Sequence, residues 1–393
     1  MSTDPVTATD RRIWPDELAF GEDVYASRIE QVQAAMKADG HDAVLIFDPE
    51  NMFWLTGYQT IGYFTFQTMI VPRDGRPTIV TRIVNRDMAH AMPTISKAIG
   101  VLDTEDHIDV LARVLNATDA QSIGFEATSR YLSVQDFQTL APKLSARFTA
   151  WRAPIERLRA VKSEAQIDRM RAAARAVEAG MEAAIGTVAE GRTDNDVAAA
   201  LYHGSIAAGS EYIGHPPMVV SGKRSALCFA LWKRKVIERG DVVLLEEAGC
   251  VDRYHVMMSR SVVVGPPTDE QKATAEALTE VLTTAVDTIR PGLTAGEIDH
   301  ACRARVERLG LGKYFKSRTA YGIGIGFPPN WAEGHIYAIR PDDPMVVEEN
   351  MTFHIIPTMF REEFGMAISD SVRVTASGCE VLTQYPRDLV VKD

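Results

Sequence analysis

The sequence predicts a protein of two domains, an α/β domain followed by a larger region that also mixes helices and strands. Its 393 residues, 46% of them hydrophobic, are enough for two full apolar cores. Helical and strand-like patterns alternate up to about residue 150, which is typical of an α/β domain. A long alanine-rich helix pattern then begins at Ser163 and opens the second region.

The first domain is expected to contain an amphipathic helix, a short buried strand and a β-hairpin. These elements span residues 25–39, 43–47, and 66–71 with 77–80. Gly40 ends the helix, and Arg73-Asp74-Gly75 has the composition of a hairpin turn.

In the second region, Ser163 has the features of a helix N-cap, because Glu164 and Gln166 follow it in the first turn. That helix is expected to run to about residue 185, and another to begin at 191–194. Further helices are predicted over 270–289 and 295–309, and strands over 242–245, 261–264, 352–356 and 371–374.

Composition excludes several classes of partner. A net charge of −11 without a dense basic run argues against nucleic acid and anionic membranes. No apolar run reaches the length of a membrane span, and the polar start, Met1 to Trp14, lacks the apolar core of a signal peptide. The cysteines have no metal-ligand spacing, so we expect reduced thiols in a cytoplasmic protein. They are Cys228, Cys250, Cys302 and Cys379.

A glycine-rich segment, Tyr321 to Trp331, carries the first family resemblance. Its Gly-Ile-Gly-Ile-Gly run resembles the Gly-His-Gly-Ile-Gly segment of the pita-bread family, which includes methionine aminopeptidase, Xaa-Pro peptidase and creatinase. Leu158 to Ala173 resembles the family's opening C-domain helix, and Arg290-Pro291-Gly292 its mid-domain turn. The resemblance implies an α+β fold, with a creatinase-like α/β domain over 1–157 and a pita-bread catalytic domain over 158–393.

The peptidases of that family hold two metal ions with Asp, Asp, His, Glu and Glu. Aligned on Ser259-Arg260-Ser261, the matching positions here are Glu246, Met257, Ile323, Ile356 and Ser369. A one-residue gap would move the first position to Glu247. Divalent metals need several charged or imidazole ligands, and aliphatic side chains have no lone pair to offer. We therefore expect no metal and no other cofactor.

Further runs resemble the metal-independent ectoine hydrolases. They lie at residues 246–255, 324–333, 351–354 and 368–371. This resemblance implies hydrolysis of a C–N bond in a small zwitterionic cyclic amidine. The leading candidates are ectoine and 5-hydroxyectoine, opened to an N-acetylated diaminobutyrate by water attack on a C=N carbon. Alternatives are a metal-dependent Xaa-Pro dipeptidase, a creatinase-like amidinohydrolase and a catalytically silent binding module.

Such chemistry needs a base or nucleophile, an acid for the leaving nitrogen, and a carboxylate for the amidinium. Strand alternation points Glu246 and Glu247 to opposite faces, and we favour Glu246 as the base and a surface ion pair for Glu247. His255 is a candidate proton shuttle or a half-exposed strand residue. His354 is a candidate acid or a core histidine, and Asp370 a ligand for a cationic nitrogen or a structural acceptor.

The acid is left open, because the place of creatinase's catalytic histidine holds Cys228 or Phe229 here. Cys228 is conceivable as a nucleophile, although a buried, inert thiol is the commoner case.

Five residues are candidates for binding substrate in the C-terminal domain. Trp331 offers a flat apolar wall and a cation–π face, and Tyr321 is expected to line the same pocket. Glu333 offers a charge partner, and Arg340 a bidentate site for a carboxylate. His215 lies upstream in the chain and is a further candidate.

An aromatic cluster in the first domain completes the set of candidates. It includes Tyr63 and Phe64, and it is too aromatic for an ordinary exposed loop. In the pita-bread family the N-domain of one subunit closes the partner's site. The resemblance therefore implies a homodimer in which Tyr63 and Phe64 bind substrate in the partner.

Overall fold

The computed structural model describes residues 18–152 and 155–393. The chain divides into two compact units, Met1–Leu158 and Arg159–Asp393, so that the division falls one residue after the expected 157/158 boundary. Helices and strands occur in both units. The polar start, Met1 to Trp14, lies outside the described residues.

The first unit is built on a six-stranded sheet of order β4-β3-β2-β1-β5-β6. Its strands are β1 (Ala43–Ile46), β2 (Gln67–Pro72), β3 (Thr78–Arg82), β4 (Lys97–Val101), β5 (Ser122–Glu126) and β6 (Arg147–Trp151). Its helices are α1 (Glu22–Ala38), α2 (Pro49–Thr56), α3 (Arg86–Ala91), α4 (His107–Asn116) and α5 (Val134–Leu140). The predicted hairpin is confirmed, because β2 and β3 pair antiparallel around the Arg73–Gly75 turn.

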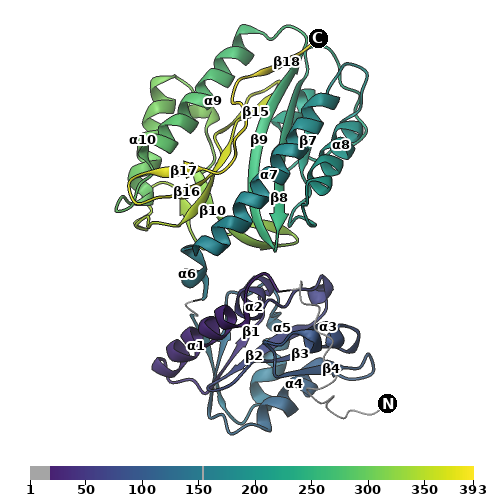
Figure 1. Cartoon of the computed structure of the whole chain (residues 1–393), viewed down its shortest axis with the longest axis vertical. Helices are drawn as coiled ribbons and strands as arrows, with labels where there is room; N and C mark the ends of the chain where they lie inside the picture. The colour runs from purple at the N-terminus through teal and green to yellow at the C-terminus, as the bar shows by residue number, and fades with distance from the viewer. Residues whose placement is uncertain (1–17, 153–154) are drawn as a thin grey trace. The chain divides into compact units, whose positions relative to one another are not determined.

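The second unit contains a ten-stranded sheet whose main path is β17-β16-β13-β10-β9-β8-β7 (Figure 1). Its strands are β7 (Met218–Ser221), β8 (Val242–Val251), β9 (Tyr254–Val264), β10 (Ala320–Phe327), β11 (Asn330–Ala332), β12 (Ala338–Ile339), β13 (Thr352–Ile355), β16 (Asp370–Val374), β17 (Cys379–Val381) and β18 (Val390–Lys392). A separate hairpin joins β14 (Thr358–Phe360) and β15 (Gly365–Ala367).

Four long helices accompany this sheet, and α6 (Ile155–Ala160) precedes them. They are α7 (Glu164–Thr187), α8 (Asp194–Ala207), α9 (Asp269–Thr288) and α10 (Ala295–Arg308). The predicted N-cap of α7 is confirmed: Ser163 and Gln166 form a reciprocal capping box. Helix α7 lies across β8 and β9 (Figure 1). A Cβ atom on Gly249 of β8 would lie 2.0 Å from Ala173 O of α7, so only glycine fits there.

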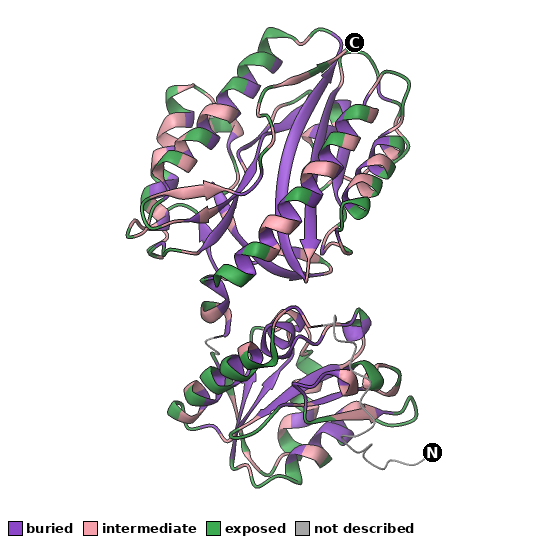
Figure 2. Ribbon diagram, viewed as in Figure 1, coloured by how far each residue is buried: buried purple, intermediate pink, exposed green. Residues whose placement is uncertain are grey.

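The β8–β9 hairpin is longer than the sequence suggested. Strands were predicted over 242–245 and 261–264 alone, because the polar residues Glu246, His255 and Arg260 interrupt the apolar pattern. In the structure these residues lie inside a continuous buried ladder (Figure 2). Asp252 and Arg253 form its turn with φ of 48° and 63°, the left-handed values that a tight hairpin needs.

Two further expectations can be compared with the described residues. The four cysteines are free thiols, as expected for reduced cysteines. Among the described residues, no helix is long and apolar enough to cross a membrane.

Candidate active site

A cavity of about 340 Å³ opens in the second unit, beside β7, β8 and β10. Most of its wall is apolar, with Val220, Leu244 and Ile356 among the lining side chains. The ionisable side chains that line it are His215, Cys228, Glu246, Arg318 and Tyr321. A small molecule in this cavity would therefore meet a few polar groups on an apolar surface, which is the usual character of a ligand site.

Strand register places Glu246 on the cavity wall. Glu246 pairs with Met218 of β7 on one side and with Ser259 of β9 on the other. Leu244, two residues earlier on β8, lines the same wall, as the period of two requires. Burial raises the pKa of Glu246 to about 8, and a hydrogen bond with the Tyr321 hydroxyl offsets part of that rise.

Glu247 lies on the opposite face of β8, beneath helices α7 and α8. A Cβ atom on Gly180 of α7 would lie 2.2 Å from Glu247 Oε2. Neither carboxyl oxygen has a hydrogen bond of good geometry among the residues that the structure describes. Burial raises the pKa of Glu247 well above its usual range, and the nearby Ser205 hydroxyl lowers it in part. The expected surface ion pair is therefore wrong.

A circuit of hydrogen-bonded polar side chains, open at its far end, runs from Tyr321 to Ser369 beside the Glu246 cavity. Tyr321 of β10 lies directly opposite His354 of β13, and the Tyr321 hydroxyl is 2.7 Å from His354 Nδ1. His354 Nε2 is 2.6 Å from Ser369 Oγ. Ser369 bridges to Ser259 through the backbone, and Ser259 pairs with Glu246. The Ser259 hydroxyl has no hydrogen-bond partner among the described residues, so the circuit makes no side-chain bond back to the Glu246 carboxyl.

His354 is held neutral within this circuit. Burial, together with the positive charge of Arg260, lowers the pKa of His354 to about 3. A group with that pKa does not carry a proton to a leaving nitrogen near neutral pH. His354 is not a lining residue, and its link to the cavity is its neighbour Tyr321, which lines it.

Aromatic rings form one wall of the cavity. Trp331 and His215 lie with ring centroids 4.8 Å apart, and Phe229 follows at 6.0 Å from His215. All three line the cavity. The face of an indole attracts organic cations, so this wall suits an amidinium.

The positions that bind metal in peptidases of this fold do not offer a ligand set here. Met257 and Ile323 are fully buried, and Ile356 lines the cavity with an aliphatic side chain. The Ser369 hydroxyl is engaged by His354. One carboxyl, Glu246, is left, and a divalent ion needs more oxygen or nitrogen donors than that.

In the described part of the chain, one group of three potential metal ligands lies close together, and it belongs to the first unit. It consists of Asp48, Glu126 and Glu156. The Glu126 carboxyl accepts hydrogen bonds from Phe47 N at 2.6 Å and from Asn51 Nδ2 at 2.7 Å. Glu126 therefore already serves as a hydrogen-bond acceptor that ties β5 to the start of α2.

Two predicted catalytic residues are occupied elsewhere, which corrects the roles expected of them. His255 is fully buried, accepts a hydrogen bond from Gly214 N at 3.0 Å and lies 2.9 Å from Arg253 O through Nδ1. Both nitrogens thus serve the backbone, and burial lowers the pKa of His255 well below its usual range. The Asp370 carboxylate binds Arg260 and Arg387, at 3.0 and 2.7 Å. Two guanidinium partners leave it no role with a substrate cation.

Two predicted substrate-binding residues are likewise engaged away from the cavity. Glu333 is fully buried between Arg159 and Lys162, at 2.7 and 2.6 Å. Arg340 is exposed and pairs with Asp343 at 2.7 Å. The expectations that Glu333 and Arg340 contact substrate are therefore corrected: the first holds the start of the second unit to β10, and the second is a surface pair.

The aromatic candidates of the first unit differ from each other. Tyr63 is buried and packs edge-on against Tyr131 with centroids 5.5 Å apart. Phe64 is 79% exposed. Only Phe64 of this pair presents its ring to the surface of the unit.

Arg318 is the cavity residue that the sequence did not reveal. It lines the cavity with its guanidinium 5.6 Å from the centre of the Tyr321 ring. It precedes the glycine-rich run in the chain, and no motif distinguishes it from a surface arginine. Arg318 lies three residues before Tyr321 and donates from Nη1 to Gly334 O at 2.8 Å, and its place on the cavity wall makes it a site residue.

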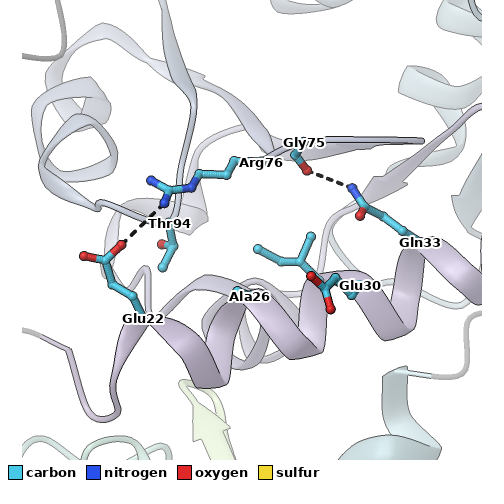
Figure 3. A pocket seen from close by; sticks show the side chains of 8 residues that line it. Glu22, Ala26, Glu30, Gln33, Gly75, Arg76 and Thr94 are labelled. Carbon is cyan, nitrogen blue, oxygen red and sulfur yellow. Dashed lines mark hydrogen bonds and ion pairs between the residues drawn. The ribbon is translucent and has the colours of Figure 1, made fainter.

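A shallower hollow of about 210 Å³ lies in the first unit, between α1 and the β2–β3 hairpin (Figure 3). Its polar side chains other than Glu30 are already paired with one another or with the backbone. Gln33 donates to Gly75 O at 2.8 Å, and Arg76 pairs with Glu22 at 3.5 Å. The cavity around Glu246 is the stronger candidate, because its carboxyl faces open space.

Comparison with known proteins agrees with this architecture. Residues 28–161 match the creatinase/prolidase N-terminal domain, and residues 168–376 match metallopeptidase family M24. The prolidase of Pyrococcus horikoshii OT3 superposes with a TM-score of 0.82 at 24% identity, covering 93% of this chain and 100% of that one.

Two curated relatives are similar over nearly the whole length. Ectoine hydrolase of Halomonas elongata is 31% identical, over 95% of this chain and 99% of that protein. A Xaa-Pro dipeptidase of Pyrococcus furiosus is 27% identical, over 92% of this chain and 99% of that protein.

Fold and site together define a two-domain hydrolase of the creatinase/prolidase type that acts on C–N bonds. The chain belongs to metallopeptidase family M24, and the predicted α+β fold is confirmed.

Proposed function

We propose that this protein is a metal-independent hydrolase that opens a small zwitterionic cyclic amidine, with ectoine and 5-hydroxyectoine as its leading substrates. The observation that carries the proposal is Glu246: one buried carboxyl with a pKa of about 8 faces an apolar cavity. The other ligand positions of the peptidases hold groups that cannot bind a metal. The similarity to ectoine hydrolase supports the same substrate class.

The chemistry follows from the charge of Glu246. The ionised carboxylate either takes a proton from the attacking water or attacks the amidine carbon itself. Water oxygen ends on that carbon, the bond from carbon to one ring nitrogen breaks, and the leaving nitrogen receives the proton. In both routes the ionised form is the reactive one, and a cationic amidinium beside it favours ionisation.

The other cavity groups suit the two ends of such a substrate. Trp331 and His215 offer aromatic faces to the planar, cationic amidine. Arg318 is the lining residue that carries a fixed positive charge, and it can bind a substrate carboxylate through two parallel hydrogen bonds. A zwitterion with both features would be oriented by these groups, with its C=N carbon toward Glu246.

The test combines a metal assay on purified protein with an NMR time course on ectoine. Ring opening by metal-free protein, abolished in Glu246→Gln, is the expected result. Stoichiometric bound manganese, zinc or iron together with cleavage of proline dipeptides would overturn the proposal in favour of the second candidate. Absence of both activities in folded protein would point to other cyclic amidines, guanidines and betaines, or to a binding module.

A Xaa-Pro dipeptidase is the second candidate function. It is supported by the 27% identity to the Pyrococcus furiosus enzyme over 92% of this chain. Against it stand the side chains of Met257, Ile323 and Ile356, which lack the donors that the two metal ions of such peptidases need.

We also propose that the protein forms a homodimer in which the first unit of one subunit closes the other's cavity. Phe64 and Ile61, 79% and 62% exposed, form an apolar surface that a partner would cover. Sedimentation of the wild type and of Phe64→Ser tests this, with a dimer expected for the former and weakened association for the latter. A monomeric wild type at micromolar concentration would contradict the proposal.

A further inference from the structure

The Tyr321 hydroxyl has three polar neighbours and one hydrogen. The Glu246 carboxyl and the Trp331 side chain lie close enough to shift the pKa of Tyr321, and all three residues line the same cavity. Its third neighbour is His354 Nδ1, at 2.7 Å. A phenol donates once, and Trp331 N–H can only donate. Tyr321 therefore donates to either Glu246 or His354 and accepts from the other.

The same limit on the number of hydrogens applies to His354, the next residue of the chain of hydrogen bonds. The ring is buried and neutral, so it holds one hydrogen on one of its two nitrogens. Both nitrogens have partners at short distance, Tyr321 at Nδ1 and Ser369 at Nε2. When Nδ1 donates to Tyr321, Nε2 must accept from Ser369, and when Nδ1 accepts, Nε2 must donate. The chain therefore has two alternative directions.

We propose that Tyr321, His354 and Ser369 form a hydrogen-bond relay that reverses direction when Glu246 gains or loses its proton, with His354 and Ser369 as positioning residues for that carboxyl. This inference rests on the proposed function only in taking Glu246 as the reactive group.

The two states of the relay balance hydrogen for hydrogen. With Glu246 ionised, Ser369 donates to Nε2, Nδ1–H donates to Tyr321, and Tyr321 donates to the carboxylate. With Glu246 protonated, the carboxylic acid donates to Tyr321, Tyr321 donates to Nδ1, and Nε2–H donates to Ser369. Glu246 gains one proton, while the imidazole keeps one hydrogen and changes the nitrogen that carries it.

The reversal explains how one site can both take and return a proton. In either state each link from Glu246 to Ser369 pairs one donor with one acceptor, so the three links survive the gain or loss of the Glu246 proton. Ser259 has a buried hydroxyl without a partner among the described residues, and its strand neighbours Ser369.

Other charged and titratable groups face the relay from the surrounding elements. Arg260 of β9 lowers the pKa of His354, and Cys228 of the cavity wall is influenced by Glu246. His215 and Arg318 line the same cavity. A Cys228→Ser variant removes the thiol and leaves the relay in place, so it distinguishes an effect of the Cys228 thiol from an effect of Glu246.

The direct test needs no substrate. The full-length protein is labelled with ¹⁵N-histidine, and the ring nitrogens of His354 are followed by NMR from pH 6 to pH 10. We expect the hydrogen to move from Nε2 to Nδ1 as pH rises through the titration of Glu246. The change should persist in Cys228→Ser and disappear in Glu246→Gln. A His354 tautomer that stays the same over this range would overturn the relay.

Assignment of the His354 signal uses Ser369→Ala, which removes the Nε2 partner and leaves every histidine in place. Ser369→Ala only shortens a small, buried side chain, so it disturbs the packing less than replacement of the histidine itself. If His354→Asn also folds, loss of the same signal confirms the assignment.

Kinetics supply a second readout for the positioning role. With an amidine that the enzyme hydrolyses, the pH profile of kcat/KM should shift to higher pH by roughly one unit in Tyr321→Phe, because the ionised Glu246 carboxylate loses its hydrogen-bond donor. The shift should be smaller in Ser369→Ala, because that donor stays in place and loses only the support of the serine hydroxyl. Ser369→Thr, which keeps the hydroxyl, should restore the profile. An equal loss of rate at every pH would mean a merely structural role and overturn the proposal.

The two proposals fail separately. A change of the His354 tautomer without ectoine turnover would support the relay and contradict ectoine as the substrate. Ectoine turnover with a His354 tautomer that does not change would support the proposed function and contradict the relay.

Discussion

Two neighbouring glutamates on β8 lie in environments that differ in their access to the cavity and in their hydrogen bonding. Glu246 borders an open cavity and bonds to Tyr321, and its pKa is raised to about 8. Glu247 is sealed under α7 and α8 without a well-aligned hydrogen bond. Burial raises both pKa values, yet only the first carboxyl can reach a substrate. A perturbed pKa therefore marks a functional site when it coincides with an accessible cavity, and not otherwise.

The largest expected effect separates the two glutamates by activity. Glu246→Gln removes the proposed base or nucleophile, so we expect a loss in kcat on the order of 10³-fold. Glu247→Gln, its matched control on the other face of the strand, should stay within about twofold of the wild type. Steady-state rates of both variants check this. Comparable losses in the two would break the distinction.

The next effect separates them by stability. Both carboxyls have pKa values above the unfolded value, so their favourable contribution is fully present below about pH 4.5 and is lost as pH rises through the folded pKa. Because Glu247 has no compensating donor of good geometry, Glu247→Gln should stabilise the protein by about 3 kcal/mol at pH 9 and by little at pH 4.5. Urea unfolding at both pH values measures it; a pH-independent difference would contradict the assignment.

A third variant tests which arginine belongs to the cavity. Arg318→Ala should raise KM for a carboxylate substrate about 30-fold with little change in kcat, corresponding to about 2 kcal/mol of binding. Arg340→Ala is the control, because Arg340 is exposed and paired with Asp343. Equal effects of the two substitutions would remove Arg318 from the site.

The smallest effects concern the helix that covers Glu247. A Cβ on Gly180 would lie 2.2 Å from Glu247 Oε2 and 3.0 Å from Leu201 O, so Gly180→Ala should destabilise by about 1–3 kcal/mol. Gly186 of the same helix meets nothing within 4 Å, and Gly186→Ala should stabilise by up to about 1 kcal/mol. Thermal unfolding compares them. A destabilised Gly186→Ala would show that helix propensity is not the governing difference.

Helices with clear caps could be predicted well from the sequence. The Ser163 cap and the 3.6-residue pattern placed α7 to within a few residues, because both signals are local. The β8–β9 hairpin was predicted too short, since its buried polar residues break the apolar pattern and are satisfied only by distant partners. Arg260, for example, donates to Ser369 O and Pro386 O, more than a hundred residues away.

The same division holds for the candidate site. The sequence by itself determined the fold and singled out Glu246 as a candidate, because both follow from residue type at positions aligned with the family and from strand alternation. Only the tertiary structure decided that Arg318 lines the cavity while Arg340 and Glu333 do not, and that His255 and Asp370 are occupied. Those roles depend on which side chains and backbone groups pair with each polar group, and these partners come from strands and loops far apart in the chain.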